Sequence, residues 1–230
     1  MRLVLWDVDG TLVHTAGHGR EAFAEAFAEL LGRPPAPDGV PMAGRTDYAI
    51  ARDLLERNGV SRAEERLPEM FRALHSALLR RRGRMAEEGY AQPGVREALL
   101  AIGSHEGFIQ TLMTGNIEQN AQVKLAAYGL DSLLDLEIGG YGSERGARSE
   151  LVDVARRKMR AKHGLDVGVE DTAVIGDTPL DVEAARAAGA RAIAVASGPY
   201  DTDELGRAGP DAVFADLRDT PALLESLSSR

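Results

Sequence analysis

A short apolar run near the N-terminus that ends in two aspartates and a glycine constrains this chain more than any other feature. Residues 3–6 read Leu-Val-Leu-Trp, and Asp7, Val8, Asp9 and Gly10 follow directly. An apolar run with β-branched and aromatic members predicts a strand covered on both faces, as in parallel sheets flanked by helices. Because ligands of such sheets bind where the strands end, the two acids mark a candidate active site.

The two acids lie two positions apart, so an extended backbone points both side chains to the same side. Two carboxylates this close are costly unless a cation offsets them or one of them stays protonated. The pair therefore indicates either a metal site or general acid–base chemistry. The alternative is an ordinary strand followed by an acidic turn, since Asp and Gly are common turn residues.

The composition is that of a globular chain with an acidic surface. Of its 230 residues 44% are hydrophobic and 27% are charged, and the net charge is −9. We expect no nucleic-acid or membrane partner, because both need a basic face; the one basic run, 80–84, is interpreted as a solvated helix end. The chain has no cysteine, so disulfides and thiolate metal sites are excluded. No apolar segment approaches the ~20 residues of a membrane span, and we expect a cytoplasmic protein.

The segment from 16 to 88 has helical spacing throughout. Apolar residues recur at intervals of three and four in 20–31, 47–58 and 67–78, which predicts three amphipathic helices and no strand. Glycine or proline follows the first two of them. We therefore predict an all-helical insertion directly after the first strand.

From residue 93 onward, strand-like and helix-like segments alternate, which is the pattern of a doubly wound parallel sheet. The predicted strands are 108–113, a weaker one at 133–138, 172–175, 192–195 and 212–214. The fold class is therefore α/β, a Rossmann-like doubly wound sheet. Its core comprises 1–15 and 89–230, and 16–88 forms a helical cap domain.

Two further polar motifs follow predicted strands. Thr114, Gly115 and Asn116 precede a helix, where a hydroxyl and free N–H groups could bind an anion or simply cap the helix. Asp177 and Asp181 follow the strand at 172–175 and could both face the same cleft. The alternative for this acid pair is a helix start with favourable first-turn charge.

Taken together, the three motifs resemble the haloacid dehalogenase superfamily in its phosphatase branch. Asp7-Val-Asp-Gly-Thr-Leu looks like its first motif, Thr114-Gly-Asn is similar to its second, and Gly176-Asp-Thr-Pro-Leu-Asp resembles its fourth. The motifs stand in the family's order, and the resemblance covers the whole chain. It implies an Mg²⁺-dependent hydrolase of a small phosphate monoester, similar to phosphoglycolate phosphatases, with a small phosphorylated metabolite as partner.

The resemblance also implies roles for individual residues. Asp7 would be the nucleophile that forms an aspartyl-phosphate, and Asp9 would be the general acid and then the base. The metal residues would be Asp7, Asp9 through its backbone carbonyl, Asp177 and Asp181, the last of which would also steer a cation. The phosphate-binding residues would be Gly10, Thr11, Thr114, Gly115 and Asn116.

The chain departs from the family at the third motif, which is usually a lysine that opens a helix. Arg148 is the expected substitute for it, with Arg145 and Lys124 as the other candidates. Lys124 is disfavoured because ten residues of helix after Thr114 would carry it roughly 15 Å away.

Specificity and the exact reaction stay open at this stage. Arg45, in Gly-Arg-Thr-Asp before a predicted helix, is a candidate for binding a substrate anion, and the alternative is a loop that ends in a capped helix. A sugar-phosphate mutase of the same superfamily would carry the same motifs. A noncatalytic or receiver-like phosphate-binding module is the alternative from another class, although receivers carry no cap.

Overall fold

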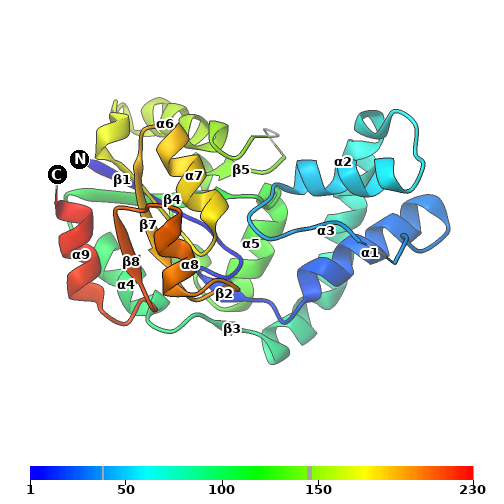
Figure 1. Ribbon diagram of the computed structural model, residues 1–230, viewed down its shortest axis with the longest axis horizontal. Helices are drawn as coiled ribbons and strands as arrows, with labels where there is room; N and C mark the ends of the chain where they lie inside the picture. Colours follow the sequence, from blue (N-terminus) through cyan, green and yellow to red (C-terminus); the bar gives the residue numbers. More distant parts are fainter. Residues whose placement is uncertain (38, 144–146, 230) are drawn as a thin grey trace.

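The protein is built on one parallel sheet with helices on both faces (Figure 1). The computed structural model describes residues 1–37, 39–143 and 147–229. The six strands lie in the order β5-β4-β1-β6-β7-β8, and every neighbouring pair is parallel. They are β1 (Arg2–Trp6), β4 (Phe108–Thr114), β5 (Gly140–Tyr141), β6 (Thr172–Gly176), β7 (Arg191–Val195) and β8 (Ala212–Phe214). The predicted α/β fold is confirmed.

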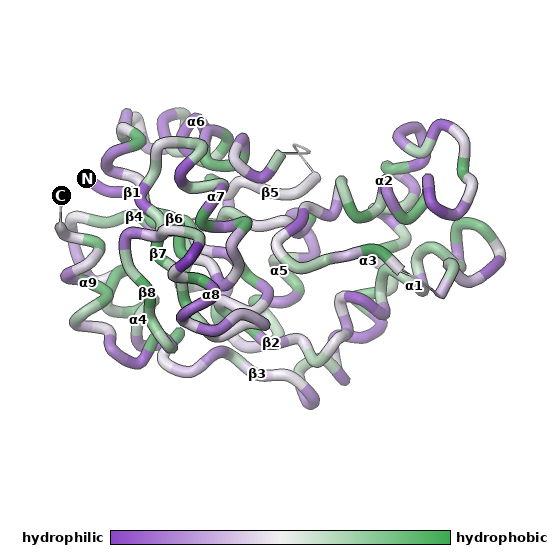
Figure 2. Tube along the Cα trace, in the orientation of Figure 1, coloured by the Kyte–Doolittle hydropathy of each residue, from purple (hydrophilic) through white to green (hydrophobic). Residues whose placement is uncertain are grey.

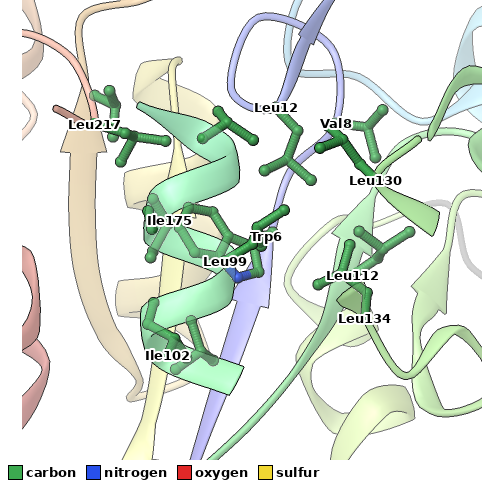
Figure 3. Packing of buried hydrophobic residues seen from close by; sticks show 14 of the residues in the cluster. Trp6, Val8, Leu12, Leu99, Ile102, Leu112, Leu130, Leu134, Ile175 and Leu217 are labelled. Atoms are coloured by element: carbon green, nitrogen blue, oxygen red, sulfur yellow. The ribbon is translucent and has the colours of Figure 1, made fainter. Parts of the chain in front are cut away.

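The first strand lies in the middle of this sheet, as its apolar sequence requires. Val4 and Trp6 point into one hydrophobic cluster, whereas Leu3 and Leu5 point into the cluster on the opposite face. All four side chains are fully buried. Figure 3 shows Trp6 beside Leu99 and Ile175 in the first of these clusters. A strand that is covered on both faces has no polar position until it ends, which is why the acids first appear there.

Helices on the two faces bury the sheet. The first cluster takes side chains from α4 (Val95–Gly103), α5 (Glu118–Ala127) and α9 (Thr220–Ser228). The second takes side chains from α6 (Glu150–His163), α7 (Pro179–Ala187) and α8 (Thr202–Arg207). The sheet therefore leaves its carboxyl edge, where the strands end, as the place for a site.

The remaining helices form a separate lobe on one side of the sheet (Figure 1). They are α1 (His18–Leu31), α2 (Asp47–Arg57) and α3 (Ala63–Glu88), and they pack around a hydrophobic cluster of their own. Their hydropathy alternates along the chain (Figure 2), as amphipathic helices require. The chain enters this lobe through β2 (Val13–His14) and leaves it through β3 (Tyr90–Ala91), which pair antiparallel.

The basic run at the end of the lobe is paired with acids. Arg80 and Arg81 of α3 bind the carboxylates of Glu21, Glu25 and Glu29 on α1. These ion pairs join the two helices and leave little unpaired positive charge for a polyanion. In the part of the chain that the structure describes, every helix is either too short or too polar to serve as a membrane span, including the 26-residue α3.

The predicted strand at 133–138 is wrong. Two short 3₁₀-helices, Asp131–Leu133 and Leu136–Ile138, occupy that segment, and only Gly140–Tyr141 pairs with β4. The reason lies in Asp135, whose backbone binds Gln110 and Thr111 of β4 while its carboxylate binds Lys162 on α6. The apolar alternation therefore reflects packing against both clusters and not an extended backbone.

Candidate active site

A cavity of about 520 Å³ lies between the carboxyl edge of the sheet and the helical lobe. The loops after β1, β4, β6 and β7 supply its floor, and residues of α1, α2 and α3 supply the opposite wall. Seven of the residues predicted from the motifs line the floor: Asp7, Asp9, Gly10, Gly115, Asn116, Arg148 and Asp177. The structure thus brings together side chains that lie up to 170 positions apart, counting from Asp7 to Asp177 (177 − 7).

Asp7, directly after β1, is buried beside a guanidinium. Arg148 Nη2 lies 2.7 Å from Asp7 Oδ1 and 2.5 Å from Asp181 Oδ1. Burial raises the pKa of Asp7 to about 6 even though Arg148 lowers it. Burial would lower the pKa of Arg148, but the carboxylates of Asp181 and Asp7 outweigh it and raise that pKa, so Arg148 stays charged. Arg148 therefore places a positive charge between Asp7 and Asp181, while Arg145 lies outside the described residues.

Asp177, directly after β6, faces the same point of the floor. Its Oδ1 accepts a hydrogen bond of 2.8 Å from Thr11 Oγ1, and a Cβ at Gly10 or Gly198 would overlap its Oδ2. Burial, together with the charges of Asp7 and Asp181, raises the pKa of Asp177 well above its usual value. The backbone at Gly10 and at Gly198 thus approaches this carboxylate so closely that both positions require glycine.

The carboxylates of Asp7, Asp177 and Asp181 converge, with one ligand atom of each within 4.8 Å of the others. Buried carboxylate oxygens are the donor set that a hard divalent cation prefers, and burial raises the pKa values of Asp7 and Asp177. Asp181, however, already accepts hydrogen bonds from the Thr178 N–H and hydroxyl with Oδ2 and pairs with Arg148 through Oδ1. The residues present therefore fit a cation held by Asp7 and Asp177, with Asp181 directing Arg148.

Asp9 is bound by a cation that the sequence argument had disfavoured. Lys124 Nζ lies 2.6 Å from both Asp9 Oδ2 and Asn116 Oδ1, and Asn116 Nδ2 donates to the same Asp9 oxygen at 2.7 Å. The prediction that Lys124 is out of reach is wrong, because residues 114–117 are not helical and α5 begins at Glu118, so the lysine lies only six positions into the helix. Burial would raise the pKa of Asp9, but Lys124 and Asn116 outweigh it and hold the pKa below its usual range.

Two of the predicted phosphate-binding groups lie behind the cavity surface. Thr114 is fully buried, and its Oγ1 accepts a hydrogen bond of 2.8 Å from Asn116 Nδ2. Thr11 is also fully buried and is bound to Asp177. Neither residue lines the cavity, whereas Gly10, Gly115 and Asn116 do. The two threonines therefore orient the residues that the cavity exposes.

The loop before α2 docks the helical lobe onto the floor. The Asp47 N–H donates to the Gly115 carbonyl at 2.6 Å, and Asp47 Oδ2 accepts from the Ile117 N–H at 2.8 Å. A Cβ at Gly115 would overlap the Arg45 carbonyl, so the glycine makes this close approach possible. Burial raises the pKa of Asp47 to about 7, although Lys124 lowers it. Arg45 itself lines the cavity, but its guanidinium pairs with Asp53 at 2.5 Å.

Comparison with known proteins agrees with this arrangement. The model of the family described as haloacid dehalogenase-like hydrolase matches residues 4–186, which contain the polar ends of β1, β4 and β6. This chain belongs to the haloacid dehalogenase-like hydrolases.

Relatives in the family carry more than one assignment. The chain is 32% identical over 215 residues to phosphoglycolate phosphatase of Synechococcus elongatus, covering 92% of this chain and 91% of that one. It is 28% identical over 231 residues to the Probable phosphatase IndB of Dickeya dadantii, covering 99% and 96%. A solved structure assigned as a beta-phosphoglucomutase from Bacteroides vulgatus has a TM-score of 0.69 at 21% identity, covering 99% and 88%, and this likeness shows a shared fold.

Sequence reasoning missed several groups around this haloacid dehalogenase-like site. Gln92 donates hydrogen bonds of 3.0 Å to the carbonyls of Gly10 and Ser197, and so joins the loops after β1 and β7. Gly198 contacts Asp177 from the same loop, and Asp47 docks the lobe. A signal for the Ser197–Gly198 loop was available, because it follows a predicted strand at the same edge of the sheet. Gln92 and Asp47 had no such signal.

Proposed function

We propose that this protein is a phosphatase that hydrolyses a small phosphate monoester through an aspartyl-phosphate on Asp7, with Mg²⁺ as its cofactor. The observation that carries the proposal is the convergence of Asp7, Asp177 and Arg148 at the floor of one cavity. Phosphatases among the relatives that match over nine-tenths of the chain support the reaction class.

We propose further that 1–15 and 89–230 form the catalytic core and that 16–88 acts as its cap. The separate hydrophobic cluster of α1–α3 supports this division. So do the short β2 and β3 strands, through which the chain leaves and re-enters the core. The cap then covers a floor that carries the chemistry.

In the first step, an Asp7 oxygen attacks the phosphorus, and the bond between phosphorus and the ester oxygen breaks. The departing oxygen takes a proton from the Asp9 carboxyl, so that an alcohol leaves. Arg148 offsets the negative charge shared by Asp7 and the phosphoryl oxygens. Gly115 and Asn116 border the same floor and would orient the phosphoryl group.

In the second step, water attacks the phosphorus of the aspartyl-phosphate while Asp9 takes its proton, and the bond from phosphorus to Asp7 breaks. Inorganic phosphate leaves, and both carboxyls regain their starting state. The hydrogen bonds from Lys124 and Asn116 favour the unprotonated Asp9 that this step needs. They oppose the protonated form that the first step needs, so Asp9 must be released from Lys124 before it can act as an acid.

The residues that would hold the cation are Asp7 and Asp177, with the Asp9 backbone carbonyl as a further oxygen donor. When bound, a divalent cation neutralises charge on the phosphoryl oxygens. A mutase would use the same floor, but it must return the phosphoryl group to a sugar hydroxyl and not to water.

The test is phosphate release from a panel of monoesters with Mg²⁺ and with EDTA, followed by intact-mass analysis of acid-quenched enzyme. We expect release only with the cation, and a transient phosphoryl group on the protein. Isomerised sugar phosphate without free phosphate would support the mutase instead. Binding of a phosphate ester with neither product would indicate the noncatalytic alternative.

A further inference from the structure

The cap wall of the cavity differs in chemistry from its floor. The side chains that α1, α2 and α3 present there include Phe23, Ile50, Leu74 and Leu78, and all four also belong to the cap's hydrophobic cluster. Met42, in the loop before α2, is half-buried and lines the same wall. The four are already almost completely buried, so a ligand that covers this wall gains stabilisation, about 25 cal/mol per Å² of apolar surface, mainly at the half-buried Met42.

One cation on the wall has no partner in the described part of the chain. Four basic side chains line the cavity, and three of them have a carboxylate within 2.7 Å: Arg148, Lys124 and Arg45. Arg20, in the first turn of α1, is exposed and makes no hydrogen bond or ion pair with any residue that the structure describes. It is therefore the one lining charge in the described chain that is available to a ligand without breaking an existing pair.

The mouth of the cavity adds an aromatic surface. His14 and Tyr90 lie on the paired strands β2 and β3, and their rings stack at 4.9 Å with an angle of 25° between the planes. Both residues line the cavity and both are exposed. Stacked rings of this kind favour flat ligands, which can lie along them.

Resting on the phosphatase function above, we propose that the substrate is the phosphate monoester of a ring-sized apolar alcohol or phenol that carries an acidic group on its far side, bound by Arg20. A cavity of about 520 Å³ falls within the range of sites that enclose molecules much larger than a two-carbon acid. Phosphoglycolate has no apolar part to cover the wall. Arg20 is the lining cation that this acidic group can meet without breaking an ion pair present in the described structure.

The test compares kcat/KM for phosphoglycolate, phenyl phosphate and 4-carboxyphenyl phosphate in the wild type and in Arg20→Gln. We expect the wild type to prefer both aryl esters to phosphoglycolate. Arg20→Gln should lower kcat/KM for the carboxylated ester roughly tenfold or more, because a charge-assisted hydrogen bond is lost, and should leave phenyl phosphate unchanged. Since each ratio is taken within one substrate, the difference in leaving group cancels.

Three control variants sharpen the test. Arg20→Lys should keep most of the preference for the carboxylate, because the charge remains. Arg72→Gln removes another exposed arginine, one that does not line the cavity, and should change nothing. Met42→Gln should lower kcat/KM for both aryl esters several-fold without affecting phosphoglycolate, and as a half-buried loop residue it spares the cap's core.

The possible outcomes distinguish the proposed substrate class from the phosphatase function on which it rests. Hydrolysis of phenyl phosphate, combined with a preference for phosphoglycolate or with equal losses on both aryl esters in Arg20→Gln, would overturn the substrate class while leaving a phosphatase. Absence of phosphate release from every ester, with Mg²⁺ present, would overturn the phosphatase itself.

Discussion

The floor of the cavity and the wall that the helical lobe forms differ in whether their positively charged side chains are paired. On the floor, each described cation is already bound to a carboxylate: Arg148 to Asp7 and Asp181, and Lys124 to Asp9. On the wall, the surface is largely apolar and Arg20 has no partner among the residues that the structure describes. A preorganised floor suits a step that is the same for every substrate, whereas an apolar wall with one available charge suits the recognition of a particular one.

This difference predicts two classes of variant. Changes to the floor should lower activity on all esters by the same factor, because they act on the phosphoryl group that all esters share. Changes to the wall should alter the ratio between esters. The following predictions test the floor, beginning with the largest expected effect.

Asp7→Asn should lower kcat by at least about 10⁴-fold on every ester, because a carboxamide is a poor nucleophile. The fold should survive, since Asp7 is a buried acid whose raised pKa shows that its charge is costly there. Phosphate release gives the rate, and thermal unfolding confirms the fold. Appreciable turnover in a folded variant would remove Asp7 from the mechanism.

Arg148→Ala should lower kcat/KM by about 10²- to 10³-fold, because the charge that offsets the nucleophile and the phosphoryl oxygens is lost. Arg148→Lys should keep part of the rate, since the charge remains while the planar guanidinium does not. The pKa of Asp7, about 6 with Arg148 present, should rise in the alanine variant, because the charge that lowers it is removed. Titration of Asp7 in the cation-free wild type and variant measures this change, and an unchanged pKa would speak against the pairing.

Lys124→Met should cost less, about tenfold in kcat/KM, and should change the pH profile. Removing the lysine removes the main influence that lowers the pKa of Asp9, so that pKa should rise and the acid form of Asp9 should persist to higher pH. Lys162→Met is the matched control, because Lys162 pairs with Asp135 and Glu137 outside the cavity. Identical pH profiles in the two variants would assign Lys124 to structure alone.

Asp47→Asn should have the smallest effect on catalysis and a measurable effect on stability. The folded-state pKa of Asp47 is about 7, raised from 3.8, so its contribution to stability is present below about pH 4 and is lost as pH rises to about 7. Asn resembles the protonated acid and should be the more stable form at pH 8, by up to about 4 kcal/mol. Urea unfolding at pH 5 and pH 8 measures this, and a difference that does not grow with pH would contradict it.

The sequence predicted the place of a side chain in the fold best where its motif follows a strand. Asp7, Asp9 and Asp177 follow apolar strands directly, so the topology of a parallel sheet alone brings them to one edge. The distance predicted for Lys124 was too long, because it was counted along a helix from Thr114, whereas α5 starts at Glu118. The lysine therefore reaches Asp9 and Asn116, while its role as the third-motif cation stays untested.

Other features depend on partners that only the folded chain reveals. Arg45 was predicted as a candidate for binding a substrate anion, with a loop that ends in a capped helix as the alternative; the structure pairs its guanidinium with Asp53 and caps α2 with Thr46, and anion binding stays a prediction. The segment at 133–138 alternates like a strand, yet its backbone binds β4 through single hydrogen bonds around Asp135. Local pattern specifies burial well, but it does not specify which neighbour satisfies a polar group.

The antiparallel pairing of Val13–His14 with Tyr90–Ala91 gives the architecture a modular character. The chain departs from the sheet and returns to it at adjacent points, so the segment between them is an insertion whose two ends lie side by side. Insertions of different length or sequence can be exchanged at such a junction without a change in the order of the strands. Exchange of the inserted segment at this junction would replace the wall of the cavity and leave the residues of its floor unchanged.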